Sequence, residues 1–414
     1  MPAIEHLRPR PFGHRSGRDR APGFLGRVRE RRAQREYDAS VLAFAYTLKG
    51  EFRDACEYLR VCHYVSVAAG ITVRTPRVGE VRVGPPISFT VELMPGQEPE
   101  DFRKPGTRMA HTLGAHGLRI EPLAGRWVRL VLLEADPLAE HFGLPPVLAR
   151  SGTDAVLLGR TEDRTTLGHA IADPAHLAVQ GMNGSGKSAF VYGLLAQLCA
   201  APDVLVAGSD ITGLLLGRPW DGTAHREWQV VGTHDVEAHA TLLDELVAEM
   251  DRRLATIPRR QDKVIPSATV PTVLVVLEEF PGLLRAAGAV PKPKNGKSLA
   301  ERIVSAQLRL LSEGRKAAFR VLTLAQRFEA TAVGGGYARD QFALRLSFRV
   351  PADSLAMLHG DDARPFGQVH ANADPGVAYL SGLGCDCERI RVPHLGEYGE
   401  YVDRIQAHGR RAAA

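Results

Sequence analysis

Eight consecutive residues, Gly181 to Ser188, have the types and spacing of a phosphate-binding loop. Their sequence, GMNGSGKS, fits the pattern GxxxxGK[ST]. Glycines allow backbone N–H groups to turn inward around phosphate oxygens, and a helix that begins at Lys187 directs its positive dipole end at the same anion. Lys187 would neutralise β/γ charge, and the Ser188 hydroxyl would bind Mg²⁺. We expect ATP and Mg²⁺ as cofactors; the alternative is a Gly/Ser-rich turn. The residues expected to contact the nucleotide are Gly181, Met182, Asn183, Gly184, Ser185, Gly186, Lys187, Ser188 and Ala189.

Two adjacent acids, Glu278 and Glu279, directly follow the apolar segment Val273 to Leu277. A buried strand would deliver both carboxylates at its carboxyl end, where doubly wound sheets bind ligands. We expect Glu278 to reach Mg²⁺ through water and Glu279 to orient or deprotonate the attacking water. Adjacent acids at a strand end are otherwise commonplace. This interpretation therefore depends on the phosphate-binding loop that precedes them in the same chain.

Three further polar residues are candidates for the catalytic site. Gln326 follows the apolar segment Arg320 to Leu324, from which its amide could sense a γ-phosphate or hold the attacking water; a capping role is the alternative. Arg345 and Arg349 alternate along the segment LRLSFRV. Either could be an arginine finger for a neighbouring subunit, or both could lie on a solvated strand face.

The elements that must position these residues begin near Val156, where short apolar segments alternate with long amphipathic ones. This alternation predicts a largely parallel sheet covered by helices on both faces. The predicted strands are 177–180, 204–207 (ending near Asp210), 270–277, 320–324 and 344–350, and the predicted helices are 187–200, 235–257 and 299–315. Every candidate site residue except Arg345 and Arg349 then falls just beyond the carboxyl end of a strand.

The remaining chain divides by composition. Residues 1–36 form an arginine-rich arm broken by Pro and Gly, 37–150 a small α+β domain, 151–395 the nucleotide-binding domain, and 396–414 a C-terminal tail, whose Ala/Arg end is expected to be disordered. Within the small domain the pattern predicts strands at 71–83, 87–93, 118–121 and 127–133 and an interrupted helix at 99–113. No nucleophile, base or metal-ligand spacing in the small domain suggests chemistry.

Charge and cysteine content restrict the function classes. The net charge is +5, and the ten arginines and five acids of residues 1–40 account for the whole excess, so the arm either touches phosphates or anionic lipid or is a solvated tail. Five scattered cysteines predict a reducing compartment, and Cys385-Asp386-Cys387 lacks the ligands of a zinc site. Without a secretory signal or an apolar run of about 20 residues, the expected location is the cytoplasm.

In order and spacing, these segments resemble the motor of the FtsK/SpoIIIE family, and especially the FtsK-like transfer proteins of actinobacterial conjugative plasmids and integrating elements, the TraB/TraSA type. The matching segments are HLAVQGMNGSGKS, EMDRRL at 249–254, LEEF at 277–280, GRKAAF at 314–319 with LAQR, and RLSFRV with DSLAML at 353–358. The resemblance covers about residues 85–395, because VELMPGQEPEDF is similar to the family's smaller subdomain.

The resemblance implies an α/β fold, with a RecA-like P-loop NTPase core behind a small α+β domain. It also implies a homo-hexameric ring around double-stranded DNA, with ATP hydrolysed between subunits and Arg345 as the better arginine-finger candidate. Glu278 departs from the family's Asp, which would shift the Mg²⁺ contact and slow turnover. Asp210-Ile211-Thr212 replaces Asp-Pro-Lys. No transmembrane span or winged-helix module is recognisable, so membrane anchoring and DNA sequence recognition are expected from partners of the membrane or transfer apparatus, from the arm, or not at all.

Three functions remain open. The first is an ATP-dependent double-stranded DNA translocase for conjugative transfer, whose DNA contacts would come from local basic loops such as Lys292 to Lys297 or Arg252 to Arg260. The second is an ATPase of a protein secretion or remodelling system, although such cores are expected to carry duplicated motor domains. The third is a nucleotide-switched, DNA-binding regulator.

Overall fold

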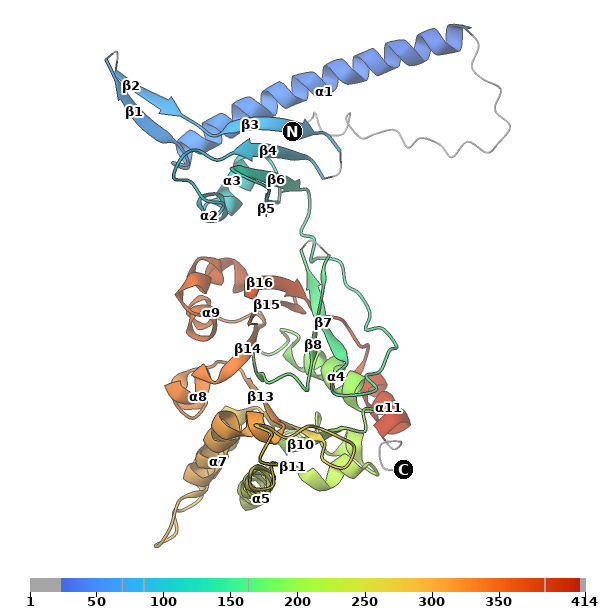
Figure 1. Cartoon of the computed structure of the whole chain (residues 1–414), viewed down its shortest axis with the longest axis vertical. Helices are drawn as coiled ribbons and strands as arrows, with labels where there is room; N and C mark the ends of the chain where they lie inside the picture. Colours follow the sequence, from blue (N-terminus) through green and yellow to red (C-terminus); the bar gives the residue numbers. More distant parts are fainter. Residues whose placement is uncertain (1–23, 69, 85, 163, 383–384, 410–414) are drawn as a thin grey trace. The chain divides into compact units, whose positions relative to one another are not determined.

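The computed structural model describes residues 24–409 apart from 69, 85, 163, 383 and 384, and for residues 24–37, 385 and 386 it describes the backbone alone. The chain divides into two compact units, Met1–Pro137 and Leu138–Ala414. Each unit has its own sheet and its own hydrophobic core (Figure 1).

The first unit combines a long helix with a small antiparallel sheet. Helix α1 (Phe24–Tyr58) leads into the hairpin β1 (His63–Val67) and β2 (Gly70–Arg74). The four-stranded sheet has the order β3-β4-β6-β5, formed by Arg77–Arg82, Ser88–Glu92, Trp127–Leu133 and Gly117–Pro122. Short helices α2 (Glu100–Arg103) and α3 (Gly106–Thr112) interrupt the sequence between β4 and β5. No described helix, α1 included, is both long and apolar enough to cross a membrane.

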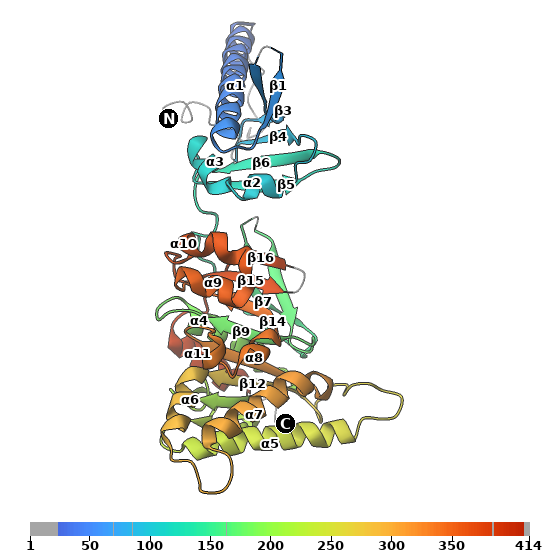
Figure 2. The same cartoon turned by 90° about the vertical axis from the view of Figure 1, so that its left-hand side faces the viewer.

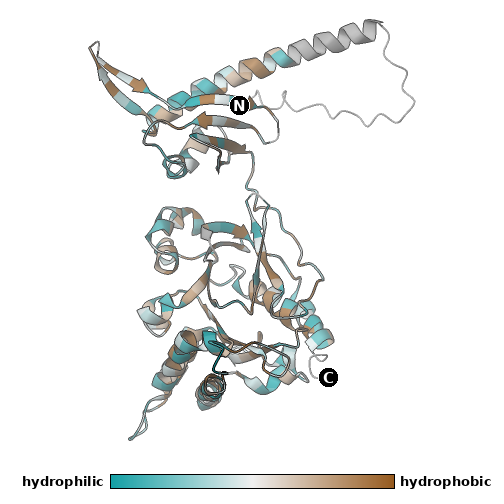
Figure 3. Cartoon of the chain, viewed as in Figure 1, coloured by the Kyte–Doolittle hydropathy of each residue, from teal (hydrophilic) through white to brown (hydrophobic). Residues whose placement is uncertain are grey.

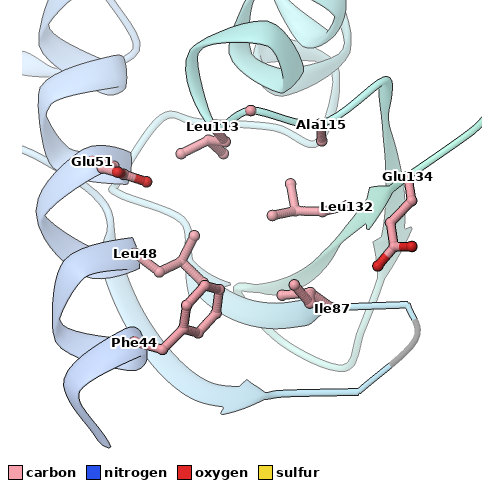
Figure 4. A pocket seen from close by; sticks show the side chains of 9 residues that line it. Phe44, Leu48, Glu51, Ile87, Leu113, Ala115, Leu132 and Glu134 are labelled. Carbon is pink, nitrogen blue, oxygen red and sulfur yellow. The ribbon is translucent and has the colours of Figure 1, made fainter. Parts of the chain in front are cut away.

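Aromatic side chains join the helices of the first unit to its sheet. The Phe52 ring on α1 meets Phe89 of β4 edge-on, with centroids 5.2 Å apart, and stacks against Phe102 of α2 at 6.3 Å. A cavity of about 30 Å³ remains between α1 and the sheet (Figure 4). Leu48 and Leu132 line it, with Glu51 and Glu134 among its other residues. This volume admits water but no nucleotide.

The second unit is built on a ten-stranded sheet with the order β11-β10-β12-β13-β9-β14-β15-β16-β7-β8. The six strands from β11 to β14 are mutually parallel, and the last four extend the sheet with antiparallel pairs. In sheet order the strands are Gln229–Val231, Val204–Asp210, Thr272–Glu278, Phe319–Ala325, His176–Gln180, Phe342–Ser347, Val377–Gly382, Cys385–Arg391, Ala155–Thr161 and Thr166–Ala170. The prediction of a mostly parallel α/β sheet is therefore confirmed.

Helices cover both faces of this sheet (Figures 1 and 2). They are α4 (Lys187–Leu198), α5 (Val236–Ala255), α6 (Phe280–Ala289), α7 (Leu299–Glu313), α8 (Gly336–Asp340), α9 (Ala352–His359), α10 (Gly367–His370) and α11 (Tyr398–His408). Strand alternation divides the core: in β12, Leu274 and Val276 pack with α4 and α11, whereas Val273, Val275 and Leu277 pack with α5, α6 and α7. Most helices mix hydrophilic and hydrophobic residues, as expected for elements with one buried side (Figure 3).

The N-terminal boundary differs from the one that the composition predicts. Helix α1 begins at Phe24, inside the segment predicted as an irregular arm, because residues 27–36 are rich in Arg, Glu, Gln and Ala, which favour helices. Residues 1–23 of that arm lie outside the described residues.

Two boundaries of the second unit also differ. The unit begins at Leu138 rather than near residue 151, since Leu144 packs against its core and its backbone nitrogen donates to His394 O. The segment predicted as a C-terminal tail, 396–414, contains the helix α11 over residues 398–408. Tyr401 and Ile405 lie on one side of α11 and are buried in the core, because residues four apart share a helix face. Residues 410–414 lie outside the described part.

Candidate functional site

The predicted phosphate-binding loop connects β9, in the middle of the sheet, to α4. Its shape depends on glycine at two positions. Gly184 and Gly186 have φ angles of 70° and 101°, which side chains rarely adopt. A Cβ atom on Gly186 would also lie 2.7 Å from the backbone nitrogen of Gly376. Gly184 and Gly186 therefore give the loop a backbone conformation that other residues rarely adopt.

Neighbouring strands anchor the start of the loop and leave its end open to a ligand. Gly181 N donates to Ala325 O at 3.3 Å, and Met182 N donates to Arg349 O at 2.9 Å. The N-cap residue of α4, Gly186, supplies no side-chain cap. The leading N–H groups of α4 therefore have no intrahelical acceptor, and together with the helix dipole they suit an anion.

Lys187 and Glu279 meet across this site. The Lys187 Nζ atom lies 3.2 Å from Glu279 Oε2, and both side chains are largely buried. Glu279 sits in the turn between β12 and α6, with φ 41° and ψ 51°. This left-handed conformation is uncommon for a residue other than glycine, and such strain concentrates at functional sites. The turn directs the Glu279 carboxylate at the lysine that the motif assigns to phosphate.

Glu278 has a different environment from its neighbour. It ends β12, and its Oε2 atom is buried without a hydrogen-bond partner in the described part of the chain. Burial, and next the negative charge of Asp210, raise the pKa of Glu278 to about 8. Asp210 lies directly opposite because β10 and β12 pair in parallel with Asp210 in register with Glu278. A cation at this point would relieve both the burial of the carboxylate and the repulsion.

The Asp210 carboxylate binds the loop that follows β10. Its side chain is fully buried, and its two carboxylate oxygens accept five hydrogen bonds of 2.7 to 2.9 Å. The donors are Thr212 N, Thr212 Oγ1, Gly213 N, Leu215 N and Leu216 N. Sequence reasoning left the role of the Asp-Ile-Thr segment open. In the structure, Asp210 and Thr212 fold the loop after β10 onto a buried carboxylate.

Gln326 lies at the same edge of the sheet. It follows β13, whose last residue, Ala325, pairs with Gln180 immediately before the phosphate-binding loop. The Gln326 side chain is exposed and forms no capping hydrogen bond within the described residues. This placement puts Gln326 at the same sheet edge as the phosphate-binding loop and offers no support for the capping alternative; its role toward the γ-phosphate or the attacking water stays a prediction.

Arg345 is not brought to the phosphate-binding loop of its own chain. It pairs with Ala178, two residues before the carboxyl end of β9. Its half-buried guanidinium donates to Phe342 O at 2.7 Å and to Leu358 O at 2.9 Å, so it is not a freely solvated strand residue. It also lines an open hollow of about 470 Å³, together with Arg339, Asp340, Asp353, Ala356, Met357, Leu358, Gly360, Asp361 and Arg364.

One arginine of the predicted basic segment 252–260 is not accessible to DNA. Arg253, on α5, is buried and donates to Glu249 Oε1 at 2.8 Å, Pro271 O at 2.8 Å and Ala317 O at 3.2 Å. It cannot contact DNA as the sequence interpretation of 252–260 allowed, because its guanidinium ties α5 to two neighbouring backbone segments. Lys294 and Lys297 in the other loop are exposed.

Comparisons with known proteins agree with this geometry. Residues 150–328 match the FtsK/SpoIIIE family. The fold is similar to the solved structure of the pCW3 conjugation coupling protein TcpA in its monomer form with ATPγS, with 17% identity over 87% of this chain and 99% of that chain and a TM-score of 0.55. A search of curated proteins finds no match.

Two secretion ATPases are more distantly similar. The cytoplasmic domain of the Type VII secretion ATPase EccC from Thermomonospora curvata is 18% identical, with a TM-score of 0.45 over 66% of this chain. ATPases 2 and 3 of EssC from Geobacillus thermodenitrificans are 14% identical, with a TM-score of 0.47 over 65% of this chain. The chain covers 33% of the former and 51% of the latter.

The family match includes the phosphate-binding loop, both acids and Gln326, all of which lie at one edge of the parallel sheet. The likeness to the coupling protein extends the same fold over the N-terminal unit. The family resemblance and the fold class expected from the sequence are thereby confirmed. This chain is an ATP hydrolase whose residues 150–328 match the FtsK/SpoIIIE family of P-loop ATPases.

Proposed function

We propose that this chain is a motor that uses ATP to translocate double-stranded DNA during transfer of a conjugative plasmid or an integrating element. The observation that carries the proposal is the pairing of Lys187 with Glu279 at 3.2 Å, beside the buried Glu278, inside an FtsK/SpoIIIE domain. The pairing joins the two halves of a phosphoryl-transfer site. The similarity in fold to a conjugation coupling protein across both units supports the transfer process.

In the proposed reaction, Lys187 leaves Glu279 and binds the β/γ-phosphate oxygens, while the N–H groups at the start of α4 hold the remaining oxygens. Glu279, released from the lysine, orients the attacking water and accepts its proton. Gln326 holds the water or the γ-phosphate from the adjacent strand end. On this proposal the nucleotide breaks the ion pair between Lys187 and Glu279. The side chains of Glu279 and Gln326 are then free at the strand edge to act on the attacking water.

The residues also fit Mg²⁺. Glu278 keeps a buried carboxylate oxygen without a partner among the described residues, and Ser188 is exposed at the start of α4. A carboxylate and a hydroxyl beside nucleotide phosphates are the ligands that this ion takes in such sites. We propose Ser188 and Glu278 as its protein ligands, Glu278 reaching the ion through water. When bound, Mg²⁺ would neutralise negative charge on the nucleotide phosphates.

We further propose a homo-hexameric ring in which Arg345 completes the site of the next subunit. Arg345 lies two residues back from the carboxyl end of its sheet, on an open hollow of about 470 Å³. A guanidinium placed away from its own phosphates can stabilise transferred charge only in a neighbour. On this proposal a monomer hydrolyses ATP slowly, and Arg345→Ala lowers turnover in the assembled ring without weakening ATP binding to the monomer.

For DNA we propose the loop between α6 and α7, with Lys294 and Lys297. Ion pairs from Arg302 to Asp244 and from Arg309 to Asp251 place α5 and α7 side by side and parallel. The loop therefore adjoins the amino-terminal half of α5, whereas Arg259 and Arg260 follow the carboxyl end of α5, roughly 20 Å further along the helix axis. The two basic segments cannot contact the same phosphates.

The central test measures ATP hydrolysis with linear duplex DNA, with single-stranded DNA and without DNA, over a range of salt concentrations. Duplex DNA should raise turnover, with a steep loss of the effect as salt rises, and Lys187→Ala should remove hydrolysis. Lys294→Ala/Lys297→Ala should reduce the salt slope by roughly 2, since each phosphate contact contributes about 0.9. Arg259→Ala/Arg260→Ala is the matched control and should behave as wild type.

Two results would contradict this function. Turnover that is indifferent to duplex DNA but rises with an unfolded polypeptide substrate would support the protein-secretion alternative. DNA binding governed by nucleotide, with transfer intact in Lys187→Ala, would support the regulator. Electron microscopy with duplex DNA and a slowly hydrolysed ATP analogue tests the ring separately, because rings should encircle the duplex.

A further inference from the structure

A buried amide lies directly behind the phosphate-binding loop. Gln180 is the last residue of β9, and its side chain is completely buried. Its Oε1 atom accepts the backbone N–H of Phe328 at 3.0 Å. Its Nε2 atom donates to Ser347 Oγ at 2.6 Å and to Ser354 O at 3.0 Å. Every hydrogen bond of this amide reaches an element other than its own strand.

The partners fix the orientation of the amide. An N–H group at Phe328 requires the amide oxygen on that side, and the carbonyl of Ser354 requires the amide nitrogen on the other. Beyond Ser347, the network continues to His359, whose Nε2 lies 2.8 Å from Ser347 Oγ and whose Nδ1 lies 2.7 Å from Ser381 Oγ. A neutral imidazole that accepts from Ser347 and donates to Ser381 satisfies every group.

The amide connects the two segments that the phosphate chemistry needs. Phe328 is two residues beyond Gln326, so the bond to Phe328 N–H fixes the backbone that carries the exposed Gln326 side chain. Ser354 belongs to α9, and Arg327 Nε donates to its hydroxyl at 2.9 Å. The segment after β13 is therefore held to α9 twice, once through Gln180 and once through Arg327.

We propose that Gln180 is a positioning residue for ATP hydrolysis: its buried amide sets the distance of Gln326 from the γ-phosphate and couples the phosphate-binding loop to α9. This inference rests on the proposed role of Gln326. Gln180 precedes the loop by one residue and touches no phosphate, so it acts only through the segment that it holds. A small displacement of that segment lowers turnover while ATP binding, which depends on the loop and Lys187, is retained.

The test replaces the amide with an apolar side chain of similar length, Gln180→Met. Turnover of the full-length chain with duplex DNA should fall about tenfold, in line with the cost of misplacing a catalytic group by a fraction of an ångström to 1 Å. The dissociation constant of a fluorescent ATP analogue should change less than twofold. A split between kcat and ATP affinity separates positioning from general loss of structure.

Gln197→Met is the matched control. Gln197 is also buried and also makes three hydrogen bonds through its amide, to Leu157 N, Leu157 O and Gly193 O. Its amide therefore makes as many buried hydrogen bonds as that of Gln180 but contacts no part of the Gln326 segment. Gln197→Met should lower the melting temperature as much as Gln180→Met and leave kcat unchanged. If Gln180→Met does not fold, Ser347→Ala removes one acceptor of the amide and should give a smaller loss of kcat.

Combining Gln180→Met with Gln326→Ala decides the mechanism. If Gln180 acts through Gln326, Gln180→Met lowers kcat in the wild-type background and causes no further loss beside Gln326→Ala. The positioning role is overturned if Gln180→Met lowers kcat equally in the wild-type and Gln326→Ala backgrounds, or if it leaves kcat unchanged. In either case Gln326→Ala alone still shows whether Gln326 is catalytic. Wild-type turnover in Gln326→Ala refutes the proposed role of Gln326 itself, and the positioning role fails with it.

Discussion

Arg252 and Arg253 are neighbours on α5 that share the carboxylate of Glu249, yet the structure predicts different consequences of removing them. Arg252 binds Glu249 from an exposed position. Arg253 has a 5% exposed side chain, bonds to Pro271 O and Ala317 O, and lies over the Phe319 ring with its guanidinium carbon 5.0 Å from the centroid. Replacement by Met keeps most of either side chain's apolar stem.

The expected magnitude follows from burial. Arg253→Met leaves two backbone carbonyls and part of the Glu249 carboxylate without their donor, and removing one partner of a buried ionic network costs about 3–5 kcal/mol. For a unit of this size, roughly 2 °C is lost per kcal/mol, so the melting temperature should fall by about 6–10 °C. Arg252→Met should cause no resolvable change, because an exposed ion pair contributes little.

Differential scanning calorimetry of the full chain, with and without ATP, measures this difference, because ATP should shift only the transition of the unit that binds it. ATP hydrolysis at 25 °C should be retained in both variants, since neither arginine touches the nucleotide edge. Equal melting temperatures for Arg252→Met and Arg253→Met would refute the buried-network argument. Loss of duplex-DNA stimulation in a thermally intact Arg253→Met would refute the claim that Arg253 cannot contact DNA.

Three further outcomes are expected. Burial lowers the pKa of His176 and His225 to about 4, so both stay neutral in the folded chain while the unfolded chain takes up protons near its ordinary pKa of 6.5. The contribution of these two histidines to stability should thus be complete above pH 6.5 and fall between pH 6.5 and 4, by up to about 1.4 kcal/mol per pH unit for each histidine, in urea titrations. Tyr401→Phe removes the hydroxyl that accepts a hydrogen bond from Trp220 Nε1 at 3.1 Å. The free energy of unfolding should fall by about 1–2 kcal/mol without a change in ATP hydrolysis. An unchanged urea midpoint would contradict the packing of α11. Gly186→Ala combines a φ of 101° with a backbone nitrogen 2.7 Å from the new Cβ, so ATP affinity measured by calorimetry should fall at least tenfold.

Sequence reasoning succeeded where a local pattern determines the structure. The phosphate-binding loop, the strand that precedes it and the helix that follows it are encoded within about a dozen consecutive residues. Strand β12, with the segment VLVVL, is apolar on both faces because helices cover both faces of the sheet there. These segments carry Lys187, Glu278 and Glu279, so the centre of the site could be predicted from the sequence.

Other features depend on partners distant in the sequence and could not be predicted in this way. Strands β15 and β16 have no long apolar run, and they exist because they pair with each other and with β14 and β7. The amide of Gln180 finds its partners 148 to 174 residues further along the chain. A single glutamine at the end of an apolar strand gives no signal of this role, and only the three-dimensional arrangement reveals it.

Two of the departures from the family pattern lie beside each other, because Asp210 and Glu278 are in register on neighbouring strands. Three carboxylates, those of Asp210, Glu278 and Glu279, lie at neighbouring strand ends. Asp210 is saturated by five donors from its own loop, and Glu279 is turned toward Lys187 by its left-handed backbone. Of these three acids, Glu278 alone keeps a buried oxygen without a partner. A loop that consumes the Asp210 carboxylate therefore leaves the proposed Mg²⁺ contact to Glu278, and the longer glutamate side chain extends that contact further from the strand than an aspartate would.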